Sequence, residues 1–177
     1  QEASPNAVAR NTYNELIYGK ENMRAKNTLG TSESVESITL EDVKNFYNNY
    51  ISPSVAKMLI VGDINEEKAR ASVEGLNTKW EAKEVNIPVY KTPEAPTKPV
   101  VYFYDIPNAK QSVLRFGAPA LAATDADYYP ASVMNYILGG GGFASRLTQE
   151  LREGKGYTYG IRSNFSGTKA KGAFTIS

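Results

Sequence analysis

The sequence contains no cysteine and no histidine. Protein zinc sites are built mainly from Cys thiolates and His imidazoles, Ser-His-Asp and Cys-His catalysis both need an imidazole, and disulfides need cysteine. These 177 residues by themselves therefore form none of those sites. An all-carboxylate site for Ca²⁺ or Mg²⁺ remains open, but no D-x-[DN]-x-[DN]-G loop is present to indicate one.

Strong net charge and long apolar runs are missing as well. Twenty Lys and Arg residues face 19 Asp and Glu, a formal net charge of +1, so no strong field attracts nucleic acid or an anionic membrane. No apolar run approaches the ~18 residues that a membrane span needs, and no signal-peptide pattern opens the chain. With 41% hydrophobic residues, we expect a soluble globular protein, with the bacterial cytoplasm or periplasm as its favoured setting.

The two ends of the chain suggest a portion of something longer. The sequence begins at Gln1 without a methionine and stops at Ser177, inside a GAFTIS pattern typical of a strand. We therefore expect an excised segment of a larger protein.

Hydrophobic periodicity predicts a mostly helical first part. Gly19 is placed to end the first helix, and Thr39 with Asp42 resembles a capping box before the second. A nearly continuous apolar run between proline and glycine predicts a buried strand. The predicted elements are helix 6–18, loop 21–31, helix 40–50, strand 55–62 and a helix from 66 to about 80.

A proline-rich stretch divides the chain. Residues 81–99 hold Pro88, Pro93, Pro96 and Pro99 amid charge and little periodicity, which is typical of a domain boundary. We predict one domain over 1–80, a linker over 81–99 and a second domain over 100–177.

The second part alternates strand and helix patterns. Its predicted elements are a strand pair 100–106 and 112–120, helix 125–138, helix 145–153, and a hairpin of 158–165 with 171–177. Two similar αβ units thus lie on either side of the linker, and we expect an α+β architecture in which sheets carry helices on one face.

Four consecutive glycines, Gly139, Gly140, Gly141 and Gly142, separate two of these helices. Glycine costs conformational entropy, so such a run is retained where backbone comes very close to something or takes up positive φ. Simple helix termination is one interpretation. Nucleotide binding is disfavoured, because a dinucleotide loop follows a strand and a P-loop ends in G-K-[ST], whereas this run follows a helix.

Arg152 and Tyr159 suggest a third interpretation. They lie seven residues apart with two glycines between them, so the chain can fold back and bring a guanidinium and a phenol to one site. These groups suit a peptide carbonyl, a terminal carboxylate or a developing oxyanion. In the alternative, Arg152 pairs with Glu150 or Glu153 on the surface while Tyr159 packs in the core.

Two segments resemble one known family. Residues 139–160, GGGGFASRLTQELREGKGYTYG, are similar to a motif of the M16 zinc peptidases, the insulinase, pitrilysin and mitochondrial processing peptidase family. Residues 29–69, LGTSESVESITLEDVKNFYNNYISPSVAKMLIVGDINEEKA, resemble a second motif of the same family, in the right order and at the right separation. The resemblance covers roughly residue 13 to the C-terminus.

This resemblance implies a LuxS/MPP-like metallohydrolase fold, with parts of two similar αβ domains whose helices pack on mixed or antiparallel sheets. The family's zinc motif, H-x-x-E-H, would lie before the segment matched here, so this chain should bind no metal and be inactive alone. Zn²⁺ is expected in the catalytic part of the parent protein or in a second M16 subunit.

The resemblance also implies roles for particular residues. The family's substrate-gripping Arg and Tyr fall on Arg152 and Tyr159, and its substrate-handling glycine loop falls on residues 139–142. We therefore predict the substrate-binding, non-zinc portion of an M16 peptidase acting on peptides or unfolded polypeptide in an enclosed chamber. The alternative is a non-catalytic structural or assembly subunit with the M16 fold.

Overall fold

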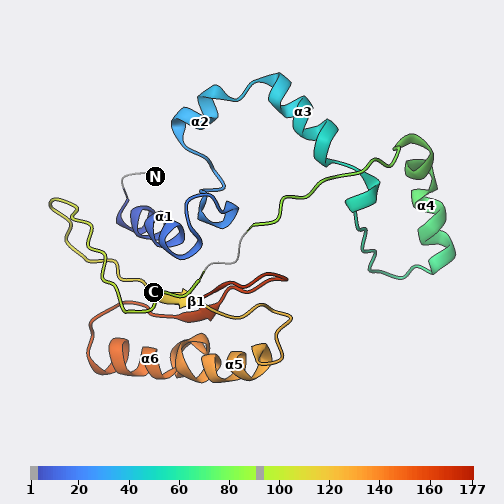
Figure 1. Ribbon diagram of the computed structural model, residues 1–177. Coiled ribbons are helices and arrows are strands. Elements are labelled where there is room, and N and C mark those ends of the chain that lie inside the picture. The colour runs from blue at the N-terminus through green and yellow to red at the C-terminus, as the bar shows by residue number, and fades with distance from the viewer. Residues whose placement is uncertain (1–3, 91–93) are drawn as a thin grey trace. The chain divides into compact units, whose positions relative to one another are not determined.

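The computed structural model describes residues 4–90 and 94–177 (Figure 1). Contacts divide the chain into two compact units, one formed by Gln1–Leu29 with Tyr90–Ser177 and the other by Gly30–Val89. Pro93 of the predicted linker lies outside the described residues. The division into two domains around a linker at 81–99 stays a prediction.

The unit of residues 30–89 is built from helices whose ends follow from local sequence. Its elements are α2 (Ser32–Ser37), α3 (Leu40–Tyr50), a 3₁₀ turn (Pro53–Val55) and α4 (Glu66–Lys79). The hydroxyl of Thr39 accepts from the Asp42 amide at 3.2 Å, and the Asp42 carboxylate accepts from the Thr39 amide at 2.8 Å. This capping box confirms the predicted start of α3, whereas α4 is capped by a single bond in which Asn65 Oδ1 accepts from the Lys68 amide at 2.9 Å.

Two predicted strands are wrong. Residues 56–61 and 100–106 adopt no regular structure, and Val61 and Val101 are 95% and 92% exposed. A strand exists only where a neighbouring strand completes its hydrogen bonds, and neither segment has such a partner within the described ranges. Both apolar runs therefore favour a strand by composition but lack the pairing that would form one. The unit of residues 30–89 contains no described strand.

The other unit contains a three-stranded antiparallel sheet. Its strands are β1 (Phe116–Pro119), β2 (Ser163–Phe165) and β3 (Ala173–Ile176), in the order β1-β3-β2. The predicted hairpin at the C-terminal end is confirmed, with Phe165 opposite Phe174. The predicted strand 112–120 is shortened to β1, and it pairs with β3 rather than with residues 100–106.

The helices of this unit begin with α1 (Pro5–Tyr18), which is capped by Ser4 and ends at Gly19 with φ +79°, as predicted. The predicted helices 125–138 and 145–153 both form, but each ends in a π-helical turn. The corresponding elements are α5 (Tyr128–Asn135), the π-helix η3 (Tyr136–Gly140), the 3₁₀ turn η4 (Gly142–Ala144), α6 (Arg146–Thr148) and the π-helix η5 (Gln149–Gly154).

The sheet carries helices on both faces, which corrects the expectation of one covered face (Figure 1). Successive side chains of a strand point to opposite faces. Ser163 and Phe165 face α5 and η3, where Ser163 Oγ donates to Asn135 Oδ1 at 2.6 Å. Thr175 faces α1, where its hydroxyl lies 2.8 Å from the hydroxyl of Tyr13.

Each of these contacts depends on a glycine. A methyl group at Gly139 would overlap Ser163 Oγ and come within 2.8 Å of the Ser163 amide nitrogen. At Gly117 in β1, a methyl group would overlap the Tyr13 hydroxyl and the Phe174 carbonyl. Glycine therefore permits both helical layers to approach the sheet closely.

We expect Gly139→Ala to destabilise the protein by about 1–3 kcal/mol, because the added methyl group must displace strand backbone as well as a side chain. Gly160→Ala is the matched control, since no atom lies within 4 Å of its added methyl group and its φ is not positive. Urea unfolding followed by circular dichroism measures both. Equal midpoints for the two variants would contradict the packing described here.

A second expectation concerns Tyr13. Burial raises the pKa of its phenol above the ordinary 10.0, an effect that the Thr175 hydrogen bond and the Arg115 charge partly offset. Well below pH 10 the phenol is neutral in folded and unfolded chains alike, so its contribution is fully present there. As pH rises through the raised pKa, the unfolded chain loses its proton first and stability falls.

The difference between Tyr13→Phe and the wild type isolates this contribution from those of the other tyrosines. At pH 7 the variant should lose about 1 kcal/mol with the hydrogen bond. Between pH 10 and 11 its stability should fall less steeply than that of the wild type. Urea unfolding across that range provides the measurement, and parallel pH profiles would show that the Tyr13 phenol titrates normally.

Candidate functional site

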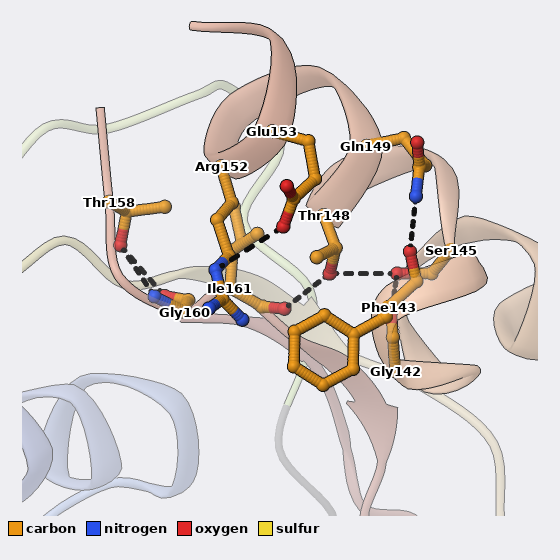
Figure 2. Close-up of polar contacts among 10 residues, drawn as sticks. All are labelled: Gly142, Phe143, Ser145, Thr148, Gln149, Arg152, Glu153, Thr158, Gly160 and Ile161. Carbon is orange, nitrogen blue, oxygen red and sulfur yellow. Dashed lines mark hydrogen bonds and ion pairs between the residues drawn. The ribbon is translucent and has the colours of Figure 1, made fainter. Parts of the chain in front are cut away.

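The structure brings Arg152 and Tyr159 together. The guanidinium carbon of Arg152 lies 5.0 Å from the centre of the Tyr159 ring. It also lies 4.6 Å from the centre of the Phe143 ring, a residue that sequence reasoning missed (Figure 2). Both distances are within the range of cation–π attraction, so two aromatic rings hold one guanidinium.

The polar ends of this cluster are open. The Arg152 side chain is 28% exposed, whereas Tyr159 is 91% and Phe143 65% exposed. Arg152 Nε lies 3.4 Å from Glu153 Oε1, an exposed ion pair of small energetic weight. Within the described ranges, neither the Nη atoms of Arg152 nor the Tyr159 hydroxyl has a hydrogen-bond partner in the chain, so these donors are available to a ligand.

The alternative drawn from residue types is correct in one part only. Arg152 does pair with Glu153, while Glu150 pairs with Lys155 at 2.9 Å. Placement of Tyr159 in the core is wrong, since its side chain is almost fully exposed.

Local backbone structure explains how the two residues meet. Arg152 lies in the π-helix η5, after which Gly156 adopts φ +63° and reverses the chain. The Gly156 amide donates to the Arg152 carbonyl at 3.0 Å, and the Tyr157 amide donates to the Leu151 carbonyl at 2.9 Å. π-helical turns are rare and recur at functional sites. Helical periodicity predicts the helix here but not its wider turn.

Buried hydroxyl groups connect the segments of the site (Figure 2). Ser145 Oγ donates to the Gly142 carbonyl at 2.7 Å and lies 3.0 Å from Thr148 Oγ1, which is 3.4 Å from the Ile161 carbonyl. Ser145 and Thr148 are 1% and 5% exposed. The glycine loop, the helix leading to Arg152 and the chain after Tyr159 are thereby joined.

The backbone of Phe143 is held as well. Gln149 Nε2 donates to the Phe143 carbonyl at 2.6 Å. This bond joins the 3₁₀ turn to the helix that follows it and fixes the backbone of the residue whose ring stacks on Arg152. In the sequence, this hydrogen bond is indicated only by the polar residues Ser145, Thr148 and Gln149, which follow the glycines within about one helical turn.

Contacts and backbone conformation within the chain explain why glycine occupies residues 140–142. Methyl groups at Gly140 and Gly141 would lie 2.8 Å from Asn135 Nδ2 and 2.7 Å from the Tyr136 carbonyl oxygen, and Gly142 has φ +63°. Together with the packing of Gly139 on β2, these contacts support the helix-termination interpretation. Contact between this loop and a substrate stays a prediction.

This chain lacks the Cys and His side chains from which protein zinc sites are mainly built. The sequence has no His or Cys, and the described residues contain no group of three or more His, Cys, Asp or Glu that could hold a metal ion. Separately, no helix in the described ranges combines the length and apolar character needed to cross a membrane.

Sequence comparisons agree with the two motifs. The model of the peptidase M16 inactive domain matches residues 37–177. A non-peptidase homolog, YmxG of Helicobacter pylori, is 31% identical over 146 residues, which cover 80% of this chain and 33% of that protein. An uncharacterized zinc protease of Streptomyces coelicolor is 26% identical over 179 residues, covering 99% of this chain and 39% of that protein.

Solved structures give the same assignment. The crystal structure of a peptidase M16 inactive domain from Pseudomonas fluorescens matches with a TM-score of 0.83 and 28% identity, over 99% of this chain and 42% of that one. A protease from Helicobacter pylori matches in fold with a TM-score of 0.70 and 21% identity, with the same coverage.

The chain spans between 33% and 42% of the length of these relatives. Its helices and small antiparallel sheet match the architecture of an M16 inactive domain. The resemblance inferred from residues 29–69 and 139–160 is thus confirmed, and the chain belongs to the M16 peptidase family, in the part that its family model describes as the inactive domain.

Proposed function

We propose that this chain is the substrate-binding, non-zinc portion of an M16 zinc peptidase that cleaves peptides or unfolded polypeptide in an enclosed chamber. One observation carries the proposal: the Arg152 guanidinium stacks on Tyr159 while its Nη donors and the Tyr159 hydroxyl lack partners in the described chain. We also propose that the chain holds parts of two LuxS/MPP-like αβ domains, one on either side of the linker at 81–99.

The chemistry of the pair suits a polypeptide. A guanidinium offers several N–H donors in a fixed fork, and a phenol offers one donor that can also accept. Bonds from a charged donor to a peptide carbonyl are stronger than neutral ones, and they strengthen further when that oxygen gains negative charge. The rings of Phe143 and Tyr159 restrict the guanidinium beforehand, so less entropy is lost when a peptide binds.

Catalysis needs groups from elsewhere. A zinc ion in such enzymes polarises the scissile carbonyl and activates water, and this chain lacks the residues to hold one. Its own residues bind and orient the peptide. The required partners are the remaining domains of the parent protein or a second M16 subunit carrying H-x-x-E-H, and the chain alone is inactive.

A second candidate has its own support. The Helicobacter pylori relative is named a non-peptidase homolog, which favours a structural or assembly subunit. In that case the stacking of Arg152 serves only to hold the glycine loop in place, and the chain binds no peptide. Direct binding of an unstructured peptide by the parent protein separates the two candidates.

Arg152→Ala in the full parent protein, combined with its zinc-bearing M16 partner, should lower kcat/KM for an unstructured peptide by about 10²–10³-fold, as expected for loss of a charged donor. Arg146→Ala is the matched control, because Arg146 is exposed and belongs to the same helical stretch. Circular dichroism checks that both variants fold. Unchanged kcat/KM in the Arg152 variant, or an equal loss in the control, would reject the proposed role.

Phe143→Ala should produce a smaller loss, about 2–5-fold in kcat/KM, since one of two cation–π contacts worth about 0.5–1 kcal/mol disappears. Phe143→Tyr keeps an aromatic face and should retain wild-type activity. Peptide cleavage assays on both variants measure the difference. A Phe143→Tyr variant as impaired as Phe143→Ala would show that stacking on Arg152 is not the reason.

A further inference from the structure

The face of the sheet beneath α1 is polar, although a helix covers it. A pocket of about 360 Å³ lies between α1 and the sheet. Its lining includes Tyr13 and Tyr18 of α1, Arg24 after that helix, Arg115 before β1, and Asn164 of β2. A sheet face covered by a helix is ordinarily apolar, because burial of polar groups costs free energy. None of the lining residues belongs to the Arg152 site.

Arg115 is the most unusual residue of this pocket. Its Nε atom is buried and has no hydrogen-bond partner in the described part of the chain. The guanidinium carbon lies 5.9 Å from the centre of the Tyr13 ring, so the group is oriented by stacking. A buried donor without an acceptor is costly, and more so when it carries charge. No acceptor among the described residues offsets this cost at Arg115.

Arg24 adds a second positive charge. Its Nη1 atom donates to the Lys171 carbonyl at 2.7 Å, its Nη2 atom contacts Thr168 Oγ1, and its guanidinium carbon lies 5.6 Å from the centre of the Tyr18 ring. These contacts are all to neutral groups.

No acidic residue lines the pocket. Within the described ranges, neither Arg24 nor Arg115 forms an ion pair with an acidic side chain. Two guanidinium groups thus line one pocket, and no carboxylate in its lining balances their charge.

We propose that this pocket binds a small oxyanion, a carboxylate or phosphate group, attracted by the two guanidinium charges of Arg115 and Arg24 that line it. Arginine is the side chain whose fork matches both anions. The exposed side-chain amide of Asn164 provides a further donor, whereas the Ser166 hydroxyl donates to the Ala173 carbonyl at 3.2 Å and lies 3.2 Å from the Tyr18 hydroxyl. The volume is near the lower end of small-molecule sites, roughly 300–1,000 Å³, and suits one small anion or the end of a larger one.

The test uses inorganic phosphate and, separately, acetate, each titrated at constant ionic strength against chloride. Backbone amide shifts of Asn164 and Thr168 in NMR spectra report on the pocket directly. We expect saturable shifts with at least one anion, and Arg115→Gln should weaken binding about tenfold or more, as for loss of a charged hydrogen bond. Arg10→Gln makes the same charge change on the exposed part of α1, outside the lining, and should leave the affinity unchanged.

A second variant, Asn164→Asp, tests the proposal even if Arg115→Gln does not fold. Asn164 is exposed on β2, so Asn164→Asp should fold while it introduces a negative charge that repels the ligand. Saturation by phosphate alone or by acetate alone supports the proposal and identifies the group. Shifts that do not saturate with either anion overturn it, as does wild-type affinity in both the Arg115 and Asn164 variants.

Discussion

The alternation of side chains along the β2–β3 hairpin is the constraint on which this unit depends. Phe165 lies opposite Phe174 on one face, with ring centres 4.8 Å apart, and Asn164 lies opposite Thr175 on the other. A shift of one residue in register would exchange these faces. The apolar face receives α5 and the turn that carries the glycine run, whereas the polar face receives α1 and the pocket with Arg24 and Arg115.

The Arg152 cluster gains its order from a buried layer rather than from its own contacts. Phe143 and Tyr159 are exposed, and exposed side chains are held only weakly by stacking alone. Beneath them, Ser145 and Thr148 form hydrogen bonds in a nearly dry environment, where such bonds are stronger and unpaired groups are costly. A buried base that presents accessible donors fits the proposed role in binding a flexible polypeptide, because order established before binding lowers its entropic cost.

Much of this protein could be read from local sequence. Caps and periodicity located α1, α3 and α4, since Gly19, Thr39 and Asn65 act on residues within one helical turn. The two family motifs identified the M16 family, and the seven-residue interval from Arg152 to Tyr159, with its glycines, indicated a reversal that places them together. The strands predicted at 55–62 and 100–106 failed because strand formation depends on a partner that local sequence does not specify.

The sequence by itself determined where α1, α3 and α4 begin, the lack of zinc ligands and the family, because each depends on residue types or on neighbours along the chain. Only the tertiary structure decided that Phe143 completes the Arg152 cluster and that Arg115 lies in a pocket with Arg24. Arg115 and Arg24 are far apart in sequence and come to line one pocket only because α1 packs on the sheet. Contacts of that kind follow from the burial of whole faces, which no local pattern encodes.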